Sequence, residues 1–300
     1  MAAPASAFAA LETGLEDKRR RVDDALRRLA TRPGRAPAVQ AAVESSLFAP
    51  AKRLRPILAL MVADVLKGDP ESVLPAACAL EMVHTASLIL DDLPSMDDAT
   101  SRRGGPACHV AHGEATAILA AFALLNRGYE VLADGWPGGP DPATRAALAG
   151  ELARAVGLAG MIAGQDADLA ATGKTLDFAT LEFIHSHKTG ALFMASAAVG
   201  ASAARATAAE QAALVSYAKN LGLAFQIVDD LIDATFEAGE AGKDVGKDAK
   251  KTTFVSFAGI EGAGQLAREL IDASAAALRA FGPRAQPLRD LALYVVTRKS

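Results

Sequence analysis

The chain has 300 residues, a net charge of −4 and a pI of about 5.8, so its overall charge argues against a nucleic-acid-binding protein. Its hydrophobic fraction is 51% and rich in Ala and Leu, whereas aromatic residues contribute 5%, which is typical of a helical protein with a buried core. The two cysteines, Cys78 and Cys108, lie at no metal-ligand spacing, which indicates a reducing compartment and no disulfide framework.

The N-terminus has no basic start before its apolar residues, and it becomes densely charged between Glu12 and Arg21. This pattern is not that of a signal peptide. We also expect no apolar run long enough to span a bilayer, and therefore no transmembrane segment. Together these observations predict a cytoplasmic protein.

Apolar residues recur at helical intervals along the chain, and no strand-like alternation of any length competes with them. The pattern predicts an all-α fold, in which central apolar helices surround a cavity, and a single domain covering residues 1–300. Segments rich in Pro and Gly, at 33–37 and 134–144, separate helices. We expect helices near residues 11–30, 38–48, 57–65, 74–90, 115–132, 148–169 and 176–199. We expect two more, one that leads into and includes Asp229 and one beyond Thr253.

Three cations, Lys52, Arg53 and Arg55, precede the apolar run from Ile57 to Val65. Positive charge is unfavourable at a helix N-terminus when it merely faces solvent. Cations placed there do, however, add to the anion-binding capacity of the helix end. We therefore interpret this segment as part of an anion site.

The next helix, residues 74–90, is apolar on nearly every side apart from Glu81 and His84, which predicts a central position. Closely spaced carboxylates repel one another unless a cation lies between them, and neighbouring arginines suggest an anion at the same place. The helix is followed by four aspartates and two arginines, which are Asp91, Asp92, Asp97, Asp98, Arg102 and Arg103. The segment therefore predicts a metal-bridged phosphate site, with His84 two turns before its first aspartate.

Spacing alone does not choose among these carboxylates. Asp91 and Asp97 are six residues apart and would point away from each other on an uninterrupted helix, and Pro94 lacks a backbone donor. We expect a bulge or a helix end here. The choice between Asp97 and Asp98 as a ligand stays open.

A second acidic cluster, Asp229, Asp230 and Asp233, follows another apolar helical run and precedes a lysine-rich segment. Asp229 and Asp233 are four residues apart, so they lie on one face of a helix. Magnesium takes one or two protein carboxylates and leaves its other positions to water and substrate phosphate. Two sparse sets of aspartates facing each other would thus hold a diphosphate through bridging magnesium ions.

In these features the sequence resembles the trans-isoprenyl diphosphate synthases, the polyprenyl synthetase family, over essentially its full length. The two signature motifs are Asp91-Asp92-x4-Asp97 and Asp229-Asp230-x2-Asp233. Further matching segments occur in the family's order, at Lys52 to Arg55, His84, Arg102-Arg103-Gly104, Lys188-Thr189 and Phe225-Gln226. The resemblance implies a magnesium-dependent homodimer that condenses isopentenyl diphosphate with dimethylallyl, geranyl or farnesyl diphosphate.

The resemblance also implies a role for each matching side chain. The diphosphate of isopentenyl diphosphate would be bound by Lys52, Arg55, His84 and Arg103. The allylic diphosphate would be held by Arg102, Lys188, Lys243 and Lys251. The magnesium cluster, three ions with substrate bound, would be held by Asp91, Asp92, Asp97, Asp229 and Asp233. Thr189 and Gln226 would supply oxygen dipoles that stabilise the allylic carbocation, while apolar walls exclude water.

Product length depends, in this family, on the bulk of the residue five positions before the first aspartate, where an aromatic side chain stops growth at farnesyl diphosphate. Here that residue is Ala86, next to Ser87, and both are small. With the insertion that contains Pro94, the chain is most similar to bacterial carotenoid-pathway enzymes. We therefore predict mainly geranylgeranyl diphosphate, with farnesyl diphosphate as the alternative and with Val83 or Met82 deeper in the cavity as a possible floor.

Two departures from the family pattern concern charged segments. The usual Gly-Lys-Arg opening is here Ala51-Lys52-Arg53, and a short segment after Asp248 leaves open whether Lys250 or Lys251 reaches the diphosphate. Among rival interpretations, a class I terpene cyclase has no use for a second diphosphate pocket, and a squalene or phytoene synthase would carry Asp-x-x-x-Asp pairs. A catalytically silent subunit would usually have lost part of an aspartate motif.

Overall fold

The structure is a computed structural model that describes residues 8–30, 34–239 and 252–297. Its contacts group the chain into two compact units, which we describe one at a time. The N-terminal unit consists of Thr13–Leu152 and Val199–Ala206, and the C-terminal unit consists of the rest of the described chain. The single domain that we expected from the sequence stays a prediction.

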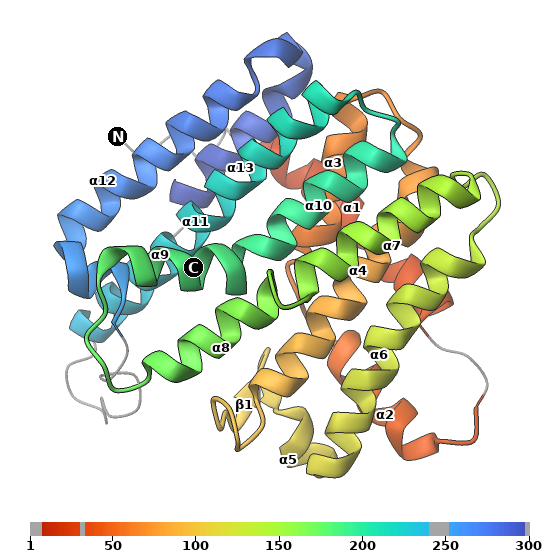
Figure 1. Cartoon of the computed structure of the whole chain (residues 1–300), viewed down its shortest axis with the longest axis horizontal. Helices are drawn as coiled ribbons and strands as arrows, with labels where there is room; N and C mark the ends of the chain where they lie inside the picture. Colours follow the sequence, from red (N-terminus) through yellow and green to blue (C-terminus); the bar gives the residue numbers. More distant parts are fainter. Residues whose placement is uncertain (1–7, 31–33, 240–251, 298–300) are drawn as a thin grey trace. The chain divides into compact units, whose positions relative to one another are not determined.

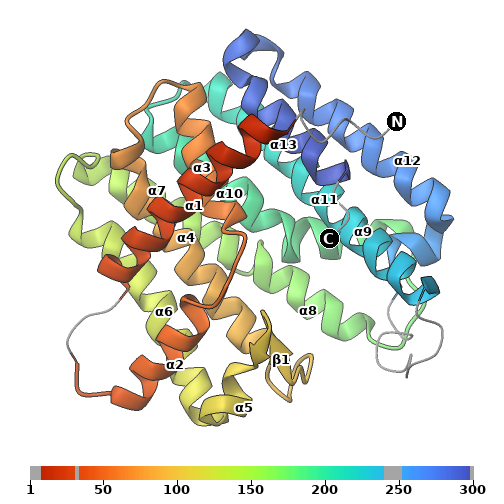
Figure 2. The same cartoon turned by 180° about the vertical axis from the view of Figure 1, so that it is seen from behind.

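The N-terminal unit is built of helices joined by short loops (Figures 1 and 2). Helices α4 and α6 run beside each other in both views, and Gly128 explains their close approach, because a Cβ there would lie 3.2 Å from the Ala79 carbonyl oxygen and 3.3 Å from Val83 Cγ2. The elements are α1 (Ala9–Leu29), α2 (Pro37–Leu47), α3 (Leu54–Val65), α4 (Pro70–Asp91), α5 (Cys108–His112), α6 (Glu114–Asp134) and α7 (Pro142–Val156), of which α1 and α7 extend past the unit's limits.

Between α4 and α5 the chain forms a small hairpin from β1 (Ser101–Arg102) and β2 (Gly105–Pro106). Arg103 and Gly104 occupy the turn with φ values of 53° and 80°. Positive φ at both central residues gives the two-residue turn that best matches the twist of paired strands. The turn therefore fixes the direction in which Arg102 and Arg103 leave the backbone.

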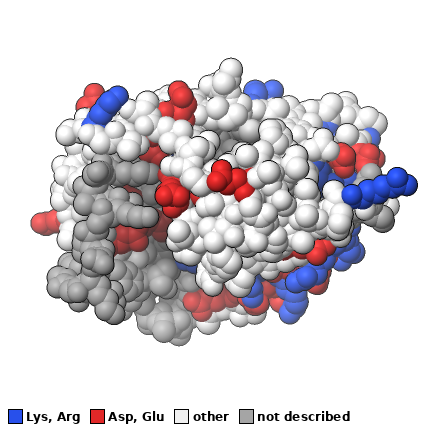
Figure 3. Space-filling view, turned by 90° about the horizontal axis from the view of Figure 1, so that it is seen from below, with Lys and Arg blue, Asp and Glu red and all other residues white. Residues whose placement is uncertain are grey.

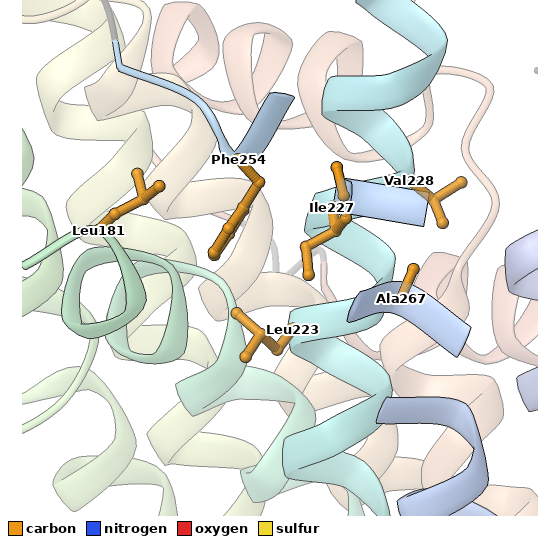
Figure 4. Close-up of a cluster of buried hydrophobic side chains, with 7 residues drawn as sticks. Leu181, Leu223, Ile227, Val228, Phe254 and Ala267 are labelled. Atoms are coloured by element: carbon orange, nitrogen blue, oxygen red, sulfur yellow. The ribbon is translucent and has the colours of Figure 1, made fainter. Parts of the chain in front are cut away.

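The C-terminal unit packs around α11, which runs beside α12 in both cartoon views. Its elements are α8 (Met161–Ala171), α9 (Phe178–Lys188), α10 (Gly190–Ala203, which passes into the other unit), α11 (Ala208–Gly239), α12 (Phe254–Ala277), the 3-10 helix η2 (Arg279–Ala285) and α13 (Gln286–Thr297). Side chains from α9, α11 and α12 form a buried apolar cluster (Figure 4), which contains Leu181, Leu223, Ile227, Val228, Phe254, Ala263 and Ala267.

The all-α fold is confirmed, and most predicted helices lie within a few residues of the observed ones. Two predicted helices are divided. The run predicted at 148–169 is broken between α7 and α8, where Gly157 and Gly160 lie, and a Cβ on Gly160 would lie 2.2 Å from the Ala155 carbonyl oxygen. The run predicted at 176–199 is broken at Thr189, between α9 and α10. In both places glycine weakens the helix, which the apolar pattern alone did not reveal.

We expected no apolar run long enough to span a bilayer. This expectation was wrong as far as the length and composition of the helices are concerned. Three described segments meet those criteria, at Pro70–Asp91, Glu114–Asp134 and Pro142–Ala171. The reason is their high content of Ala and Leu and their scarcity of charge. In Pro70–Asp91, 72% of the apolar window is buried inside the protein, against 17% in Pro142–Ala171, so core packing accounts for the composition of the first segment far better than for the last.

In Figure 3, acidic and basic side chains lie close together at several places, and much of the surface drawn in white carries neither. This distribution agrees with the small net charge of −4.

Candidate active site

Helix α4 ends at the first aspartate, as the sequence indicated. Beyond Asp91 the chain turns back, and the Asp97 amide donates to the Asp91 carbonyl oxygen at 2.9 Å. Asp98 has a φ of 48° in this turn, and its amide donates to the Leu93 carbonyl oxygen at 3.1 Å. The hydrogen bond between their backbones brings Asp97 back to the end of the helix that carries Asp91. Asp91 is half-buried there and Asp97 is exposed. Of the bulge or helix end expected between Asp91 and Asp97, the structure shows the helix end.

Asp92 differs from its neighbours because it is buried, with 2% exposure. Arg102 on the hairpin donates from Nε to Oδ1 at 2.9 Å and to Oδ2 at 3.1 Å, and from Nη2 to Oδ1. Hydrogen bonding to Asp92 raises the pKa of Arg102. The sequence assigned Asp92 to magnesium and Arg102 to the allylic diphosphate, whereas here they bind each other, and both assignments stay predictions.

Arg53 is buried, and its side chain pairs with carboxylates inside the protein. It caps α3 in the left-handed region, with a φ of 51°, and its guanidinium reaches Glu81 on α4. Arg53 Nη1 lies 2.7 Å from Glu81 Oε1, and Arg53 Nε lies 2.8 Å from Asp23 Oδ1. Arg103 Nη2 lies 3.5 Å from the same Glu81 oxygen. The buried carboxylate thus balances two arginines that come from different segments.

Sequence reasoning did not assign a role to Glu81. The signal was present, because Glu81 is a single carboxylate within an otherwise apolar helix that follows a group of three cations. A buried charge of this kind requires an opposite charge nearby. The partner could not be named without the tertiary contact.

Arg55 and His84 lie in contact, with Arg55 Nη1 3.0 Å from His84 Nε2. Burial, and then the charges of Arg55 and Arg103, lower the pKa of His84 well below its usual value. Because an arginine can only donate, the neutral imidazole accepts at Nε2 and carries its proton on Nδ1. The structure thus brings together three of the four side chains assigned to isopentenyl diphosphate, while Lys52 is exposed two residues before the start of α3.

In the C-terminal unit, α8 and α9 approach closely at Gly164. A Cβ on Gly164 would lie 2.1 Å from the Lys188 backbone nitrogen, so a larger residue cannot occupy this position without moving a helix. One turn later on α8, Asp168 Oδ2 lies 2.7 Å from Lys188 Nζ. This contact holds Lys188, assigned to the allylic diphosphate, at the C-terminal end of α9. Asp168 is a second residue whose role the sequence did not reveal.

A chain of hydrogen bonds connects the α9–α10 break to the second aspartate motif. Thr189 Oγ1 donates to Gln226 Oε1 at 3.1 Å, and Gln226 Nε2 donates to Asp230 Oδ1 at 3.0 Å. The Phe254 amide, at the start of α12, donates to Asp230 Oδ2 at 3.0 Å. Burial raises the pKa of Asp230. Both oxygens of Asp230 are thus engaged within the protein, which agrees with its omission from the predicted magnesium ligands.

A cavity of about 450 Å³ lies within the C-terminal unit beside this chain. Thr189, Gln226 and Asp233 line it together with Asp168 and Lys188. Asp229 is half-buried on the same helix but is not among the lining residues. Lys243 and Lys251, also assigned to the allylic diphosphate, lie outside the described residues.

Magnesium suits the aspartates that line each helix end. No three His, Cys, Asp or Glu side chains within the described ranges form a ready-made metal cluster. Magnesium does not need one, because it binds through one or two carboxylates and completes its shell with water and substrate oxygens. Asp91 and Asp97 in one unit and Asp229 and Asp233 in the other fit this sparse chemistry, and their role as ligands stays a prediction.

The small residues that precede Asp91 lie in the last two turns of α4, and their role in product length stays a prediction. Ala86 is buried with 3% exposure, and Ser87 is half-buried with its hydroxyl donating to the His84 carbonyl oxygen at 2.9 Å. Met82 and Val83 are fully buried one turn deeper. No aromatic side chain occurs between Met82 and Asp91.

Comparison with known proteins identifies a family. A sequence profile of the polyprenyl synthetases matches residues 36–277. The chain is 43% identical over 269 residues to geranylgeranyl pyrophosphate synthase 9, chloroplastic, of Arabidopsis thaliana, covering 87% of this chain and 74% of that protein. It is 39% identical to the geranylgeranyl diphosphate synthase of Cyanophora paradoxa, over 97% of both chains. The crystal structure of an FPP/GFPP synthase from Zymomonas mobilis is similar with a TM-score of 0.86 and 35% identity, over 96% of this chain and 99% of that one.

Proposed function

The chain belongs to the polyprenyl synthetase family, and we propose that it condenses isopentenyl diphosphate with allylic diphosphates to yield mainly geranylgeranyl diphosphate. The observation that carries the proposal is the retention of both aspartate motifs together with a second set of cations. Arg55 contacts His84 at 3.0 Å, and the positive charge of Arg103 acts on the same imidazole. We assign these side chains to a second diphosphate, for which a terpene cyclase would have no use. The chain is a prenyltransferase, and the choice of substrates and product is our proposal.

In the proposed reaction, the two diphosphates are treated differently. Isopentenyl diphosphate remains intact as the nucleophile, so cations and the neutral His84 suffice to bind it. The allylic substrate must lose its diphosphate, and Lys188, held by Asp168, neutralises part of the charge that develops on this leaving group. Magnesium, which the resemblance assigns to Asp91, Asp92, Asp97, Asp229 and Asp233, would supply further electrostatic stabilisation of the same group.

Ionisation leaves an allylic carbocation, which the double bond of isopentenyl diphosphate attacks. Thr189 and Gln226 line the cavity of the C-terminal unit, and their oxygen atoms would stabilise the positive charge. Loss of a proton then restores an alkene, and the released diphosphate is the base that we expect to accept it. Because the cation reacts with water, an apolar wall is part of the mechanism.

Small residues at the position that decides chain length support geranylgeranyl diphosphate as the main product. Ala86 leaves room where an aromatic ring would end growth one isoprene unit earlier. The Zymomonas mobilis structure is described as an FPP/GFPP synthase, so farnesyl diphosphate is the alternative to test. The resemblance to carotenoid-pathway enzymes agrees with the longer product, and carotenoid synthesis is the pathway that we propose for it.

We further propose a cytoplasmic homodimer. Three apolar side chains on one side of α6, Ile118, Leu119 and Phe122, are exposed by 37%, 56% and 61%. Adjacent exposed apolar residues on a helix usually mark a protein interface. A second copy of the chain is the partner that we propose for this surface.

The test is an assay of purified protein with magnesium, labelled isopentenyl diphosphate and, in turn, dimethylallyl, geranyl and farnesyl diphosphate. Chromatography of the products should show geranylgeranyl diphosphate from each primer, and chelation of magnesium should abolish turnover. A product that stops at farnesyl diphosphate would favour the alternative. Full activity after chelation would refute the metal-dependent mechanism, and absence of condensation with every primer would refute the proposed function.

A further inference from the structure

Glu81 occupies an unusual position in the N-terminal unit, because one buried carboxylate serves two arginines. Its side chain is 2% exposed, and its Oε1 atom lies 2.7 Å from Arg53 Nη1 and 3.5 Å from Arg103 Nη2. Removing this carboxylate would leave Arg53 with Asp23, at 2.8 Å, and would take from Arg103 the carboxylate that lies 3.5 Å away, in a poorly solvated place. The position of both arginines therefore depends in part on Glu81.

Glu81 also lies on the face of α4 that carries the substrate-binding residues. His84 and Asp91 follow it by three and ten residues, spacings that return to the same side of a helix. Glu81 is thus about one turn farther from the aspartates than His84. It is too deeply buried to contact a diphosphate itself, so its effect on the substrate must pass through its arginine partners.

Through Arg53, the carboxylate also fixes the start of α3. Arg53 occupies the N-cap position of that helix, and its Nη2 donates to the Leu47 carbonyl oxygen at 2.5 Å, which anchors the preceding loop. Lys52 precedes Arg53 in this loop, and Arg55 lies in the first turn of the helix. A shift of Arg53 would therefore displace the neighbouring cations.

Two contacts within the protein orient the guanidinium of Arg103. Arg103 Nη1 lies 3.5 Å from the Ser46 carbonyl oxygen, and Arg103 Nη2 lies at the same distance from Glu81. Both contacts are long for charge-assisted hydrogen bonds, which are usually near 2.8 Å. These two contacts orient the guanidinium but use only part of its five N–H donors. The remaining donors can bind a diphosphate.

We propose that Glu81 is a positioning residue for the isopentenyl diphosphate pocket. It holds Arg103 directly and the Lys52–Arg55 segment through Arg53. It therefore affects the binding of isopentenyl diphosphate rather than the binding of the allylic substrate. The inference deepens the proposed function and rests on it for the identity of the substrate.

The experiment is a double-mutant cycle on the full chain with Glu81→Gln, Arg103→Gln and the double variant. Glu81→Gln should raise the KM for isopentenyl diphosphate about tenfold, as expected for loss of one charge-assisted interaction, and leave the allylic KM within about twofold. In the Arg103→Gln background, the further effect of Glu81→Gln should be smaller, because the part that passes through Arg103 is already lost while the part that passes through Arg53 remains. Asp23→Asn is the matched control, since Asp23 binds Arg53 but not Arg103, and its effect on KM should be smaller.

Equal increases in both KM values, or strictly additive effects in the cycle, would overturn the inference in favour of a general structural role. If Glu81→Gln does not fold, Glu81→Asp keeps the charge and should still raise the KM for isopentenyl diphosphate, whereas an unchanged value would overturn the inference. If the wild-type protein condenses none of the primers, the proposed function fails separately. The inference is then decided by calorimetric titration with inorganic pyrophosphate, which should bind Glu81→Gln more weakly than wild type and would overturn it by binding equally.

Discussion

The close contact between α8 and α9 makes Gly164→Ala a sharp test of how the C-terminal unit positions Lys188. The new Cβ would lie 2.1 Å from the Lys188 backbone nitrogen and 2.8 Å from the His187 carbonyl carbon, whereas ordinary contact begins near 3.4 Å. The atoms that it meets belong to the backbone, so no side-chain rotation relieves the clash. One helix must move by about 1.3 Å relative to the other, the difference between the 2.1 Å and 3.4 Å separations.

Such a movement has two measurable consequences. Overpacking of this kind costs about 1–3 kcal/mol in the free energy of unfolding, which urea denaturation can measure. The 2.7 Å contact between Lys188 Nζ and Asp168 Oδ2 cannot survive a comparable displacement without rearrangement. Because a misplacement of about 1 Å near a reacting group can reduce activity about a hundredfold, we expect kcat/KM for the allylic substrate to fall about tenfold to a hundredfold.

Gly14→Ala is the matched control, because the Cβ of this α1 residue would meet nothing within 4 Å. The control should retain its kinetics and gain about 0.5–1 kcal/mol of stability, as expected when alanine replaces glycine in a helix. Wild-type stability and wild-type allylic kinetics in Gly164→Ala would refute the assignment of Gly164 as the residue that sets the position of Lys188.

Three further predictions concern product length, pH and assembly. Ala86→Phe should shorten the main product from geranylgeranyl to farnesyl diphosphate by filling the space beside α4, and an unchanged product distribution in chromatography would place the floor elsewhere. Because burial lowers the pKa of His84, the unfolded state binds a proton that the folded state does not, so stability should be full above about pH 6.5 and fall as the pH decreases below it, by at most about 1.4 kcal/mol per pH unit. In His84→Gln, the free energy of unfolding measured by denaturation should depend less on pH in that window than in the wild type. An identical pH dependence would contradict a neutral buried His84. Phe122→Glu should place a charge in the proposed apolar interface and shift the protein to a monomer in sedimentation velocity, whereas a dimer as stable as wild type would exclude this face of α6.

Local sequence was sufficient for the properties that depend on one segment. The end of α4 near Pro94 follows from four aspartates and a proline that cannot continue an apolar helix. The pairing of Asp229 and Asp233 on one helix face follows from a spacing of four. The two motifs and the matching cations, in their order, were enough to indicate the family, because their chemistry is carried by residue type and spacing.

Tertiary structure decided which charged groups pair with one another within the protein. Asp92 and Asp230 belong to the signature motifs, yet Asp92 binds Arg102 and Asp230 accepts hydrogen bonds from Gln226 and from the start of α12. Glu81 was an isolated carboxylate in the sequence and became the common partner of two arginines in space. Charge pairing depends on distances between segments remote in the chain, and a periodic pattern along one helix contains no information about those distances.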